Sequence, residues 1–431
     1  MLLRRTYRAY VDSYQGLSRD TWLLALLTLI NRSGTMVVPF LSIYLASELG
    51  LSKLQIGMAM SAFGAGSVGG SYLGGWLTDK LGYYRVMFWT LLGGGVMFWW
   101  LMTASTFESF AALVFVVALV GDAFRPAAMA AIGAYARPEN RTRSMTLIRM
   151  AINIGFAAGS AVGGFLAQAV GFEWLFIIDG STCVLAAFAL LLILKPRPQY
   201  ESAEEAAERQ RGIVAKPFYR DTVFVVFLAM MFVSSLAFMQ LFSTYPLFVE
   251  EMLGLTKSQL GGIMALNGLL IAALEMPIIH RVEQRYRPLD LMAVGMAIFA
   301  FGYLVFVVLP WEYAIPLSLF SIVFLTFGEI IAFPVSNSFA LQRAPAAQRG
   351  RYMGAYGMNF SLSLMLSPTI GFYLTERLGY AWLWAIMGIA FLVAATGLLV
   401  LRMRIAPPTP GNSTPILDEE WSDVQRDGVG V

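Results

Sequence analysis

Residues 75–85 read Gly-Trp-Leu-Thr-Asp-Lys-Leu-Gly-Tyr-Tyr-Arg, a short polar segment between two long apolar stretches at 54–78 and 84–104. Each stretch supplies the roughly 20 residues that a helix needs to cross the hydrocarbon core of a bilayer. Gly82 permits a tight turn between the two helices, and Asp79 is placed to pair with a cation at a helix end. The segment therefore predicts two membrane-spanning helices joined by a short polar loop.

Apolar stretches of this length recur along almost the whole chain of 431 residues. We predict twelve spans near 21–46, 54–78, 84–104, 109–135, 144–169, 172–194, 221–249, 258–280, 289–310, 313–341, 350–374 and 380–402. Unpaired backbone groups are costly in lipid, so the spans are expected to be helices. A β-barrel would instead alternate apolar and polar residues over strands of about 10 residues, a period we do not find. The expected fold class is an all-α membrane protein.

The composition suits a lipid environment and excludes several other classes of protein. Hydrophobic residues make up 58% of the chain and charged residues 13%, against about 25% charged in soluble domains. The net charge of +3 comes from short loops without interleaved aromatic residues, so we expect no nucleic-acid partner. The single cysteine, Cys183, lies in an apolar span, where a packing role is expected. One cysteine allows neither an internal disulfide nor a cysteine metal cluster, and we predict no metal site.

The distribution of lysine and arginine predicts the orientation. The N-terminal segment, the loops after even-numbered spans and the C-terminal segment hold 24 of the 30 basic residues, and the opposite loops hold three. Because positive charge accumulates on the cytoplasmic side, both termini are expected in the cytoplasm. Residues 1–20 lack the apolar region of a cleaved signal. We therefore predict a multi-pass protein of the bacterial inner membrane, in contact with the lipid bilayer.

A polar stretch near the middle divides the chain into two related halves. The expected domains are a six-helix bundle at 1–194, a cytoplasmic linker at 195–220, a second six-helix bundle at 221–402 and a mobile cytoplasmic tail at 403–431. A constant offset of 208 residues matches Pro126 with Pro334, Arg141 with Arg349, Arg143 with Arg351, Met145 with Met353, Gly163 with Gly371 and Leu166 with Leu374. A parallel repeat implies a pseudo-two-fold axis along the membrane normal, with a substrate site between the halves.

The loop at 75–85 resembles the signature of the major facilitator superfamily, G-x-L-x-D-[RK]-x-G followed by basic residues. Tyr84 stands where the family often has a basic residue. The resemblance implies that Asp79 and Arg85 belong to a charge latch that holds the outward-facing state. Gly75 is expected to allow close helix contact, and Gly82 to form the turn. The alternative is a solvated loop with ordinary topology charges.

Residues 155–164 look like the antiporter motif of the same superfamily, G-x-x-x-G-P-x-x-G-G. The matching positions are Gly155, Gly159, Gly163 and Gly164, and Ser160 replaces the proline. The resemblance implies antiport. Small residues at four-residue spacing also let helices approach closely, so the alternative is tight packing alone.

Ionisable residues inside the spans are functional candidates, because each costs on the order of 2.5–3.5 kcal/mol at mid-helix on insertion scales. There are seven: Arg32, Asp122, Arg125, Arg149, Asp179, Glu275 and Glu329. Residues 328–334 resemble the tenth span of bacterial multidrug/proton antiporters, which implies that Glu329 helps to bind proton and substrate. Glu275 and Asp122 are further candidates for proton coupling, whereas Asp179 is expected to cap or pair structurally.

Three of these residues, Arg32, Arg125 and Arg149, place positive charge in the N-terminal half, where a guanidinium fork can receive a substrate carboxylate. Asp122 and Arg125 are three residues apart, which places them on one helix face; they either exchange partners during transport or form a closed pair. The predicted substrate cavity is completed by Asn31, Asn153, Asn267 and Tyr245.

These patterns predict a proton-coupled secondary transporter that exports small amphipathic molecules by alternating access. The alternatives are proton-coupled uptake of peptide-like or anionic solutes, and a transporter-like sensor that binds without net flux. We expect no cofactor beyond the proton gradient, and a monomer. One histidine and one cysteine offer little for catalysis, so an enzyme is not expected.

Overall fold

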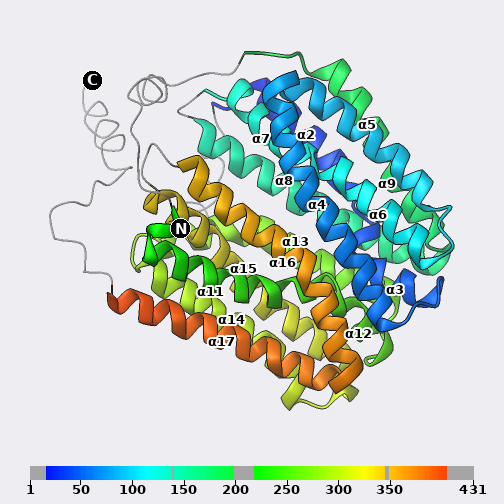
Figure 1. The fold of residues 1–431 in the computed structure, drawn as a ribbon, viewed down its shortest axis with the longest axis vertical. Helices are drawn as coiled ribbons and strands as arrows, with labels where there is room; N and C mark the ends of the chain where they lie inside the picture. The colour runs from blue at the N-terminus through cyan, green and yellow to red at the C-terminus, as the bar shows by residue number, and fades with distance from the viewer. Residues whose placement is uncertain (1–15, 138–139, 199–217, 345–348, 405–431) are drawn as a thin grey trace, which may run out of the picture.

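The computed structural model describes residues 16–137, 140–198, 218–344 and 349–404. Within these ranges the chain is helical and contains no strand, which confirms the all-α fold class (Figure 1). Most of the predicted linker at 195–220 and nearly all of the predicted tail at 403–431 lie outside the described residues.

The N-terminal half crosses the membrane six times, and two of these passes are broken. Its helices are α2 (Arg19–Ser33), α3 (Val37–Ser47), α4 (Lys53–Leu81), α5 (Tyr83–Leu101), α6 (Phe107–Asp122), α7 (Phe124–Tyr135), α8 (Arg141–Ala169) and α9 (Glu173–Ile193). The first pass consists of α2 and α3, and the fourth of α6 and α7.

The C-terminal half also makes six passes. Its helices are α11 (Thr222–Phe238), α12 (Thr244–Glu251), α13 (Lys257–Val282), α14 (Pro288–Val308), α15 (Ala314–Arg343), α16 (Arg349–Leu378) and α17 (Tyr380–Arg404), with 3₁₀ turns at Phe218–Arg220, Met239–Leu241 and Trp311–Tyr313. Helices α11 and α12 form one broken pass. In the described residues, nine of the twelve passes are apolar and long enough to be scored as membrane spans. The other three, α4, α5 and α16, carry glycine, serine or aromatic residues that hydropathy scales rank low.

Large apolar side chains cover the outside of the helices. Leu192 is 85% exposed and Val308 is 77% exposed, and many tryptophan, leucine and phenylalanine side chains are similarly uncovered. A water-soluble monomer rarely exposes so much contiguous apolar surface. The surface therefore fits lipid contact by a multi-pass membrane protein.

The break between α2 and α3 is stabilised by a buried carboxylate. Asp179 of α9 is 1% exposed, and it accepts hydrogen bonds from the backbone N–H groups of Met36 and Val37, each at 2.9 Å. These groups begin α3 and have no partner within their own helix. Asp179 therefore acts as the cap that the sequence suggested.

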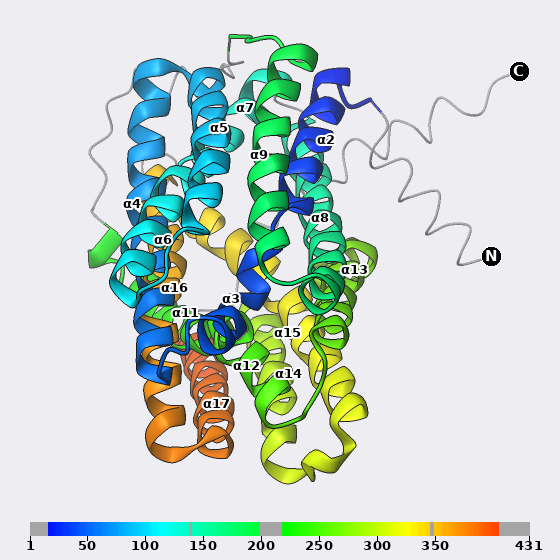
Figure 2. The ribbon, with the colours of Figure 1, turned by 90° about the vertical axis from the view of Figure 1, so that its right-hand side faces the viewer.

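Two helix pairs join the halves, α4 with α16 and α8 with α13. Figures 1 and 2 show the halves as separate bundles, with α3 and α12 between them. A Cβ atom placed on Gly64 of α4 would lie 2.5 Å from the Cα of Met365. One placed on Gly261 of α13 would lie 2.5 Å from the carbonyl oxygen of Ser160. Glycine therefore lets the two bundles meet backbone to backbone.

We call the face where α2 begins and α17 ends the terminal side, and the opposite face the far side. Polar contacts cross between the halves on the far side. Lys53 Nζ lies 3.0 Å from Glu251 Oε2, and the Ser61 and Thr369 hydroxyls lie 2.7 Å apart. Ser258 N–H donates to Gln168 Oε1 at 3.1 Å. The structure therefore has a closed far side.

A second internal repeat, with an offset of 204 residues, forms the start of α4 and α13. Residues 49–57 read Leu-Gly-Leu-Ser-Lys-Leu-Gln-Ile-Gly, and residues 253–261 read Leu-Gly-Leu-Thr-Lys-Ser-Gln-Leu-Gly. Both copies contain a glycine of positive φ and a capping box. Lys53 lies 4.6 Å from the ring centroid of Tyr380, and Lys257 lies 4.3 Å from that of Phe172. Each lysine thus contacts an aromatic ring of the opposite half.

Candidate functional site

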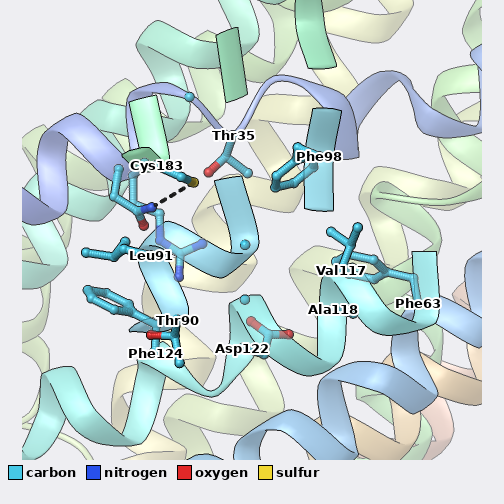
Figure 3. A pocket seen from close by; sticks show the side chains of 15 residues that line it. Thr35, Phe63, Thr90, Leu91, Phe98, Val117, Ala118, Asp122, Phe124 and Cys183 are labelled. Atoms are coloured by element: carbon cyan, nitrogen blue, oxygen red, sulfur yellow. Dashed lines mark hydrogen bonds between the residues drawn. The ribbon is translucent and has the colours of Figure 1, made fainter. Parts of the chain in front are cut away.

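The described residues form a cavity inside the N-terminal bundle, which we call the N-half cavity. Its polar side chains are Asn31, Arg32, Thr35, Thr90, Asp122 and Cys183. About 90 Å³ of it can be occupied by the centres of water molecules, which is room for a few waters. The side chains of Thr35, Phe63 and Asp122 converge on this space (Figure 3).

Two charged side chains, Arg32 and Asp122, line the N-half cavity. The buried Nε of Arg32 has no hydrogen-bond partner. Asn31 Nδ2 contacts Cys183 Sγ at 3.4 Å. In the described part of the chain, Asp122 is in neither a hydrogen bond nor an ion pair within 4.0 Å. The cavity therefore contains a guanidinium and a carboxylate that face the same space without direct contact.

A helix break separates Asp122 from Arg125. Helix α6 ends at Asp122 and α7 begins at Phe124, with Ala123 between them. Arg125 is exposed and is not among the residues that line the N-half cavity. Among the described residues the two side chains form no ion pair within 4.0 Å, and Arg125 does not line the N-half cavity in this conformation.

A second cavity lies between the halves, where α8 meets α13 and α15. Arg149 Nη2 lies 2.7 Å from Glu275 Oε1, with the side chains 47% and 13% exposed. Asn153 and Pro334 line the same space. The sequence assigned Arg149 to substrate and Glu275 to proton coupling, and the structure joins them as an ion pair between the bundles.

Glu329 of α15 faces α13, where it meets an amide. Asn267 Nδ2 lies 2.9 Å from Thr326 Oγ1 and 3.4 Å from Glu329 Oε2. Thr326 in turn donates to the carbonyl of Ile322 at 2.6 Å. Asn267 is only 3% exposed, so it orients Glu329 and is not the free cavity residue that we expected.

Tyr245 lies in the core of the C-terminal bundle. It is fully buried, with ring centroids 6.0 Å from Phe306 and 6.3 Å from Trp384. The break between α11 and α12 places it among aromatic side chains. Tyr245 lines neither the N-half cavity nor the cavity at Arg149 and Glu275, and its place in a substrate cavity stays a prediction.

The loop residues of the predicted latch lie apart from the opposite half. Asp79 and Arg85 are exposed, and neither is in an ion pair within 4.0 Å among the described residues. Gly82 has a φ of +82°, as the tight turn requires. A Cβ on Gly75 would meet no atom within 4 Å, whereas one on Gly74 would overlap the carbonyl of Ala123. The close helix contact predicted for Gly75 thus belongs to Gly74.

The glycines at 155–164 lie against two partners. Cβ atoms on Gly155, Gly159 and Gly163 would crowd Arg32, Ser33 and Met36 of the first pass. One on Gly164 would lie 2.5 Å from the carbonyl oxygen of Lys257. Ser160 is fully buried. The motif therefore packs α8 against both its own bundle and the opposite one.

Several residues around these sites were missed from the sequence. Thr326 is three residues before Glu329, so helical spacing could have placed it on the same face. Thr35 and Thr90 gave no signal, because an isolated threonine in an apolar span is ordinary. Tyr356 and Asn359 line a third cavity, in the C-terminal bundle, and no motif pointed to them.

The comparisons with known proteins agree with this architecture. Residues 21–368 match the Major Facilitator Superfamily. The chain is 25% identical to the multidrug resistance protein MdtH of Aeromonas hydrophila, over 88% of this chain and 94% of that protein. It is 23% identical to a Na⁺, Li⁺, K⁺/H⁺ antiporter of Planococcus maritimus, over 83% and 90%.

Among solved structures, an auto-inhibited peptide transporter of the POT family superimposes with a TM-score of 0.73. It is 16% identical, and the match covers 91% of this chain and 98% of that one. At this identity the likeness concerns the fold alone. With twelve passes in two bundles, charged residues where the bundles meet and a family match across most of its length, the chain belongs to the Major Facilitator Superfamily of membrane transporters.

Proposed function

We propose that this protein is a proton-coupled secondary transporter that exports small amphipathic molecules across the bacterial inner membrane, with both termini in the cytoplasm. The observation that carries the proposal is the placement of carboxylates beside the contact between the bundles. Glu275 is paired across that contact, and Glu329 faces the same helix, α13. Similarity to a multidrug resistance protein and to a cation/proton antiporter supports export and antiport.

The contact between α8 and α13 must change when the bundles rock, so the Arg149–Glu275 ion pair lies where a coupling group is needed. A carboxylate enclosed in protein loses solvation, and either a proton or a cationic substrate can neutralise it. We propose that the two compete at Glu329, which Asn267 orients. We propose that this conformation, with contacts between the halves on the far side and exposed latch residues, is the state that faces the cytoplasm.

The test follows the internal pH of energised inverted vesicles with a fluorescent dye. Lipophilic cations should release protons from vesicles that contain the native protein, and Glu329→Gln should abolish the release. Glu312→Gln makes the same chemical change at an exposed residue of the far side and should behave like the native protein. Equal proton release from Glu329→Gln vesicles would contradict the assignment, and release by Na⁺ alone would identify alkali-cation exchange.

Proton-coupled uptake of anionic or peptide-like solutes is the second candidate. It is favoured by the half-exposed guanidinium of Arg149 and by the unpaired Arg32. Neutralising either arginine should stop anion uptake and spare expulsion of lipophilic cations. Binding without accumulation in vesicles would instead indicate a sensor.

A further inference from the structure

The N-half cavity differs from the other charged sites in that its opposite charges are kept apart. Arg149 and Glu275 meet at 2.7 Å, whereas Arg32 and Asp122 face one cavity without an ion pair within 4.0 Å. Both residues lie in the described part of the chain. An unpaired charge in a membrane-embedded bundle is costly and needs water or a ligand to neutralise it.

The fold fixes the backbone positions from which both charged side chains extend. A Cβ on Gly155 of α8 would lie 2.7 Å from the Cβ of Arg32, so α8 packs directly against the base of that side chain. A Cβ on Gly74 of α4 would overlap the carbonyl of Ala123, so α4 packs against the helix break that follows Asp122. Backbone contacts of this kind leave little freedom for the two helices to bring the charges together.

The rest of the wall is suited to an amphipathic molecule. Thr35 and Thr90 offer hydroxyl groups, and Phe63, Phe98 and Phe124 offer apolar surface. The space for a few water molecules matches a small polar head more closely than a whole drug-sized ligand. Arg125 is not among the residues that line the cavity. The carboxylate of Asp122 therefore remains available in the cavity to pair with a cation.

We propose that the N-half cavity binds the zwitterionic head of an amphipathic substrate. Arg32 receives the anionic group through its guanidinium, Asp122 receives the cationic group, and the phenylalanine side chains contact the apolar remainder. This assignment rests on the proposed transport function and names the class of molecule carried. It also gives Asp122 a role in substrate binding in place of the proton coupling predicted from the sequence.

The test measures binding to the purified full-length protein in lipid nanodiscs by titration calorimetry. The probes are phenylalanine, its methyl ester and its N-acetyl derivative, which share one apolar group and carry both charges, the positive charge alone or the negative charge alone. Phenylalanine should bind at least about tenfold more tightly than either derivative, because each derivative leaves one cavity charge unpaired.

Two variants assign the charges separately. Arg32→Gln should bind phenylalanine and its methyl ester equally, and Asp122→Asn should bind phenylalanine and its N-acetyl derivative equally. Arg287→Gln, at an exposed position between α13 and α14, should keep the native preference. Equal binding of all three probes by the native protein, or binding of none, would overturn the proposal.

The same experiment separates this inference from the proposed function. Calorimetry requires no proton gradient, so a preference for the zwitterion would stand even if Glu329→Gln left proton release unchanged. Conversely, proton-coupled export of lipophilic cations together with equal binding of the three probes would leave the transport proposal intact and remove this one.

Discussion

At the scale of single residues, the structure shows contacts between charged side chains that the sequence could not predict. The apolar residues on either side of Glu275 and Glu329 predicted that both lie inside a span. They also predicted that placing a charge there costs free energy. The pairing of the charges could not be predicted from the sequence, because Arg149 and Glu275 are 126 positions apart in the chain. The burial of Tyr245 in the core of the C-terminal bundle could not be predicted, because an aromatic residue in an apolar span looks the same in sequence whether it faces a cavity or a core.

The Arg149–Glu275 ion pair gives a prediction about stability. Glu275→Gln should destabilise the protein by roughly 1–3 kcal/mol, because Arg149 loses its charged partner, and the half-exposed arginine keeps the loss below that of a fully buried pair. The measurement is thermal unfolding in detergent. Arg149→Gln combined with Glu275→Gln should recover part of the loss. Additive losses would show that the two side chains do not interact.

Asn267 gives a prediction about coupling. Asn267→Leu removes the amide that contacts both Thr326 and Glu329, so Glu329 should become less well oriented and the number of protons released per exported molecule should fall. Proton and substrate fluxes measured together in vesicles give this ratio. Asn359→Leu, at the third cavity, is the matched control. A reduced flux at an unchanged ratio would contradict an orienting role.

At the scale of helices, the breaks were the least predictable features. Residues 21–46 read as one apolar run, yet the structure divides it into α2 and α3 at Gly34–Met36. A Cβ on Gly34 would overlap the side chain of Thr182 in α9, and Asp179 supplies the cap. Both causes are long-range contacts, which local hydropathy does not contain.

Asp179 should therefore be sensitive to the type of substitution. Asp179→Ala leaves the backbone N–H of Val37 without its acceptor, and the N–H of Met36 with only the Gly34 carbonyl oxygen at 2.9 Å, and should cost about 1–3 kcal/mol of stability. Asp179→Asn keeps one carbonyl oxygen and should cost less. Thermal unfolding of both variants checks the order, and equal losses would show that a single carbonyl oxygen does not suffice and that both carboxylate oxygens or the negative charge are needed.

The contact between α8 and α13 allows a test with adjacent residues. Gly261→Ala should weaken closure of the far side, because its Cβ would lie 2.5 Å from the Ser160 carbonyl oxygen, whereas Gly262→Ala meets nothing within 4 Å. The measurement is disulfide cross-linking of Gln168→Cys with Ser258→Cys in a Cys183→Ser background. A drop in yield for Gly261→Ala alone supports the contact, and an equal drop for both variants contradicts it.

At the scale of the whole molecule, the number of passes was predictable and the conformational state was not. Apolar runs of about 20 residues give the number of spans whichever side of the protein is closed. The 208-residue repeat indicated two related halves, and the glycine contacts of α4 with α16 and of α8 with α13 show where they meet. The state of closure depends on contacts such as Lys53 with Glu251, which join residues far apart in sequence.

The duplicated lysines give a prediction about the conformational equilibrium. Lys53→Gln and Lys257→Gln each remove one cation–aromatic contact between the halves, and Lys53→Gln also removes the ion pair with Glu251. The double variant should shift the population towards the state open on the far side. Both contacts lie near the surface, so each should contribute at most about 1 kcal/mol. Distances between spin labels on the far side measure the shift. An unchanged distribution would show that the lysines do not hold this side closed.

The backbone contacts between the bundles also affect how fast the two bundles can rock against each other. Where glycine meets backbone, as at Gly64 and Gly261, two surfaces can separate and meet again without side chains having to leave one rotamer for another. Interlocked side chains would add an energy barrier each time the bundles separate, whereas contacts between glycine and backbone add little. We therefore expect the barrier to rocking to come mainly from the side-chain contacts that cross between the bundles, such as Arg149 with Glu275, rather than from these glycine contacts.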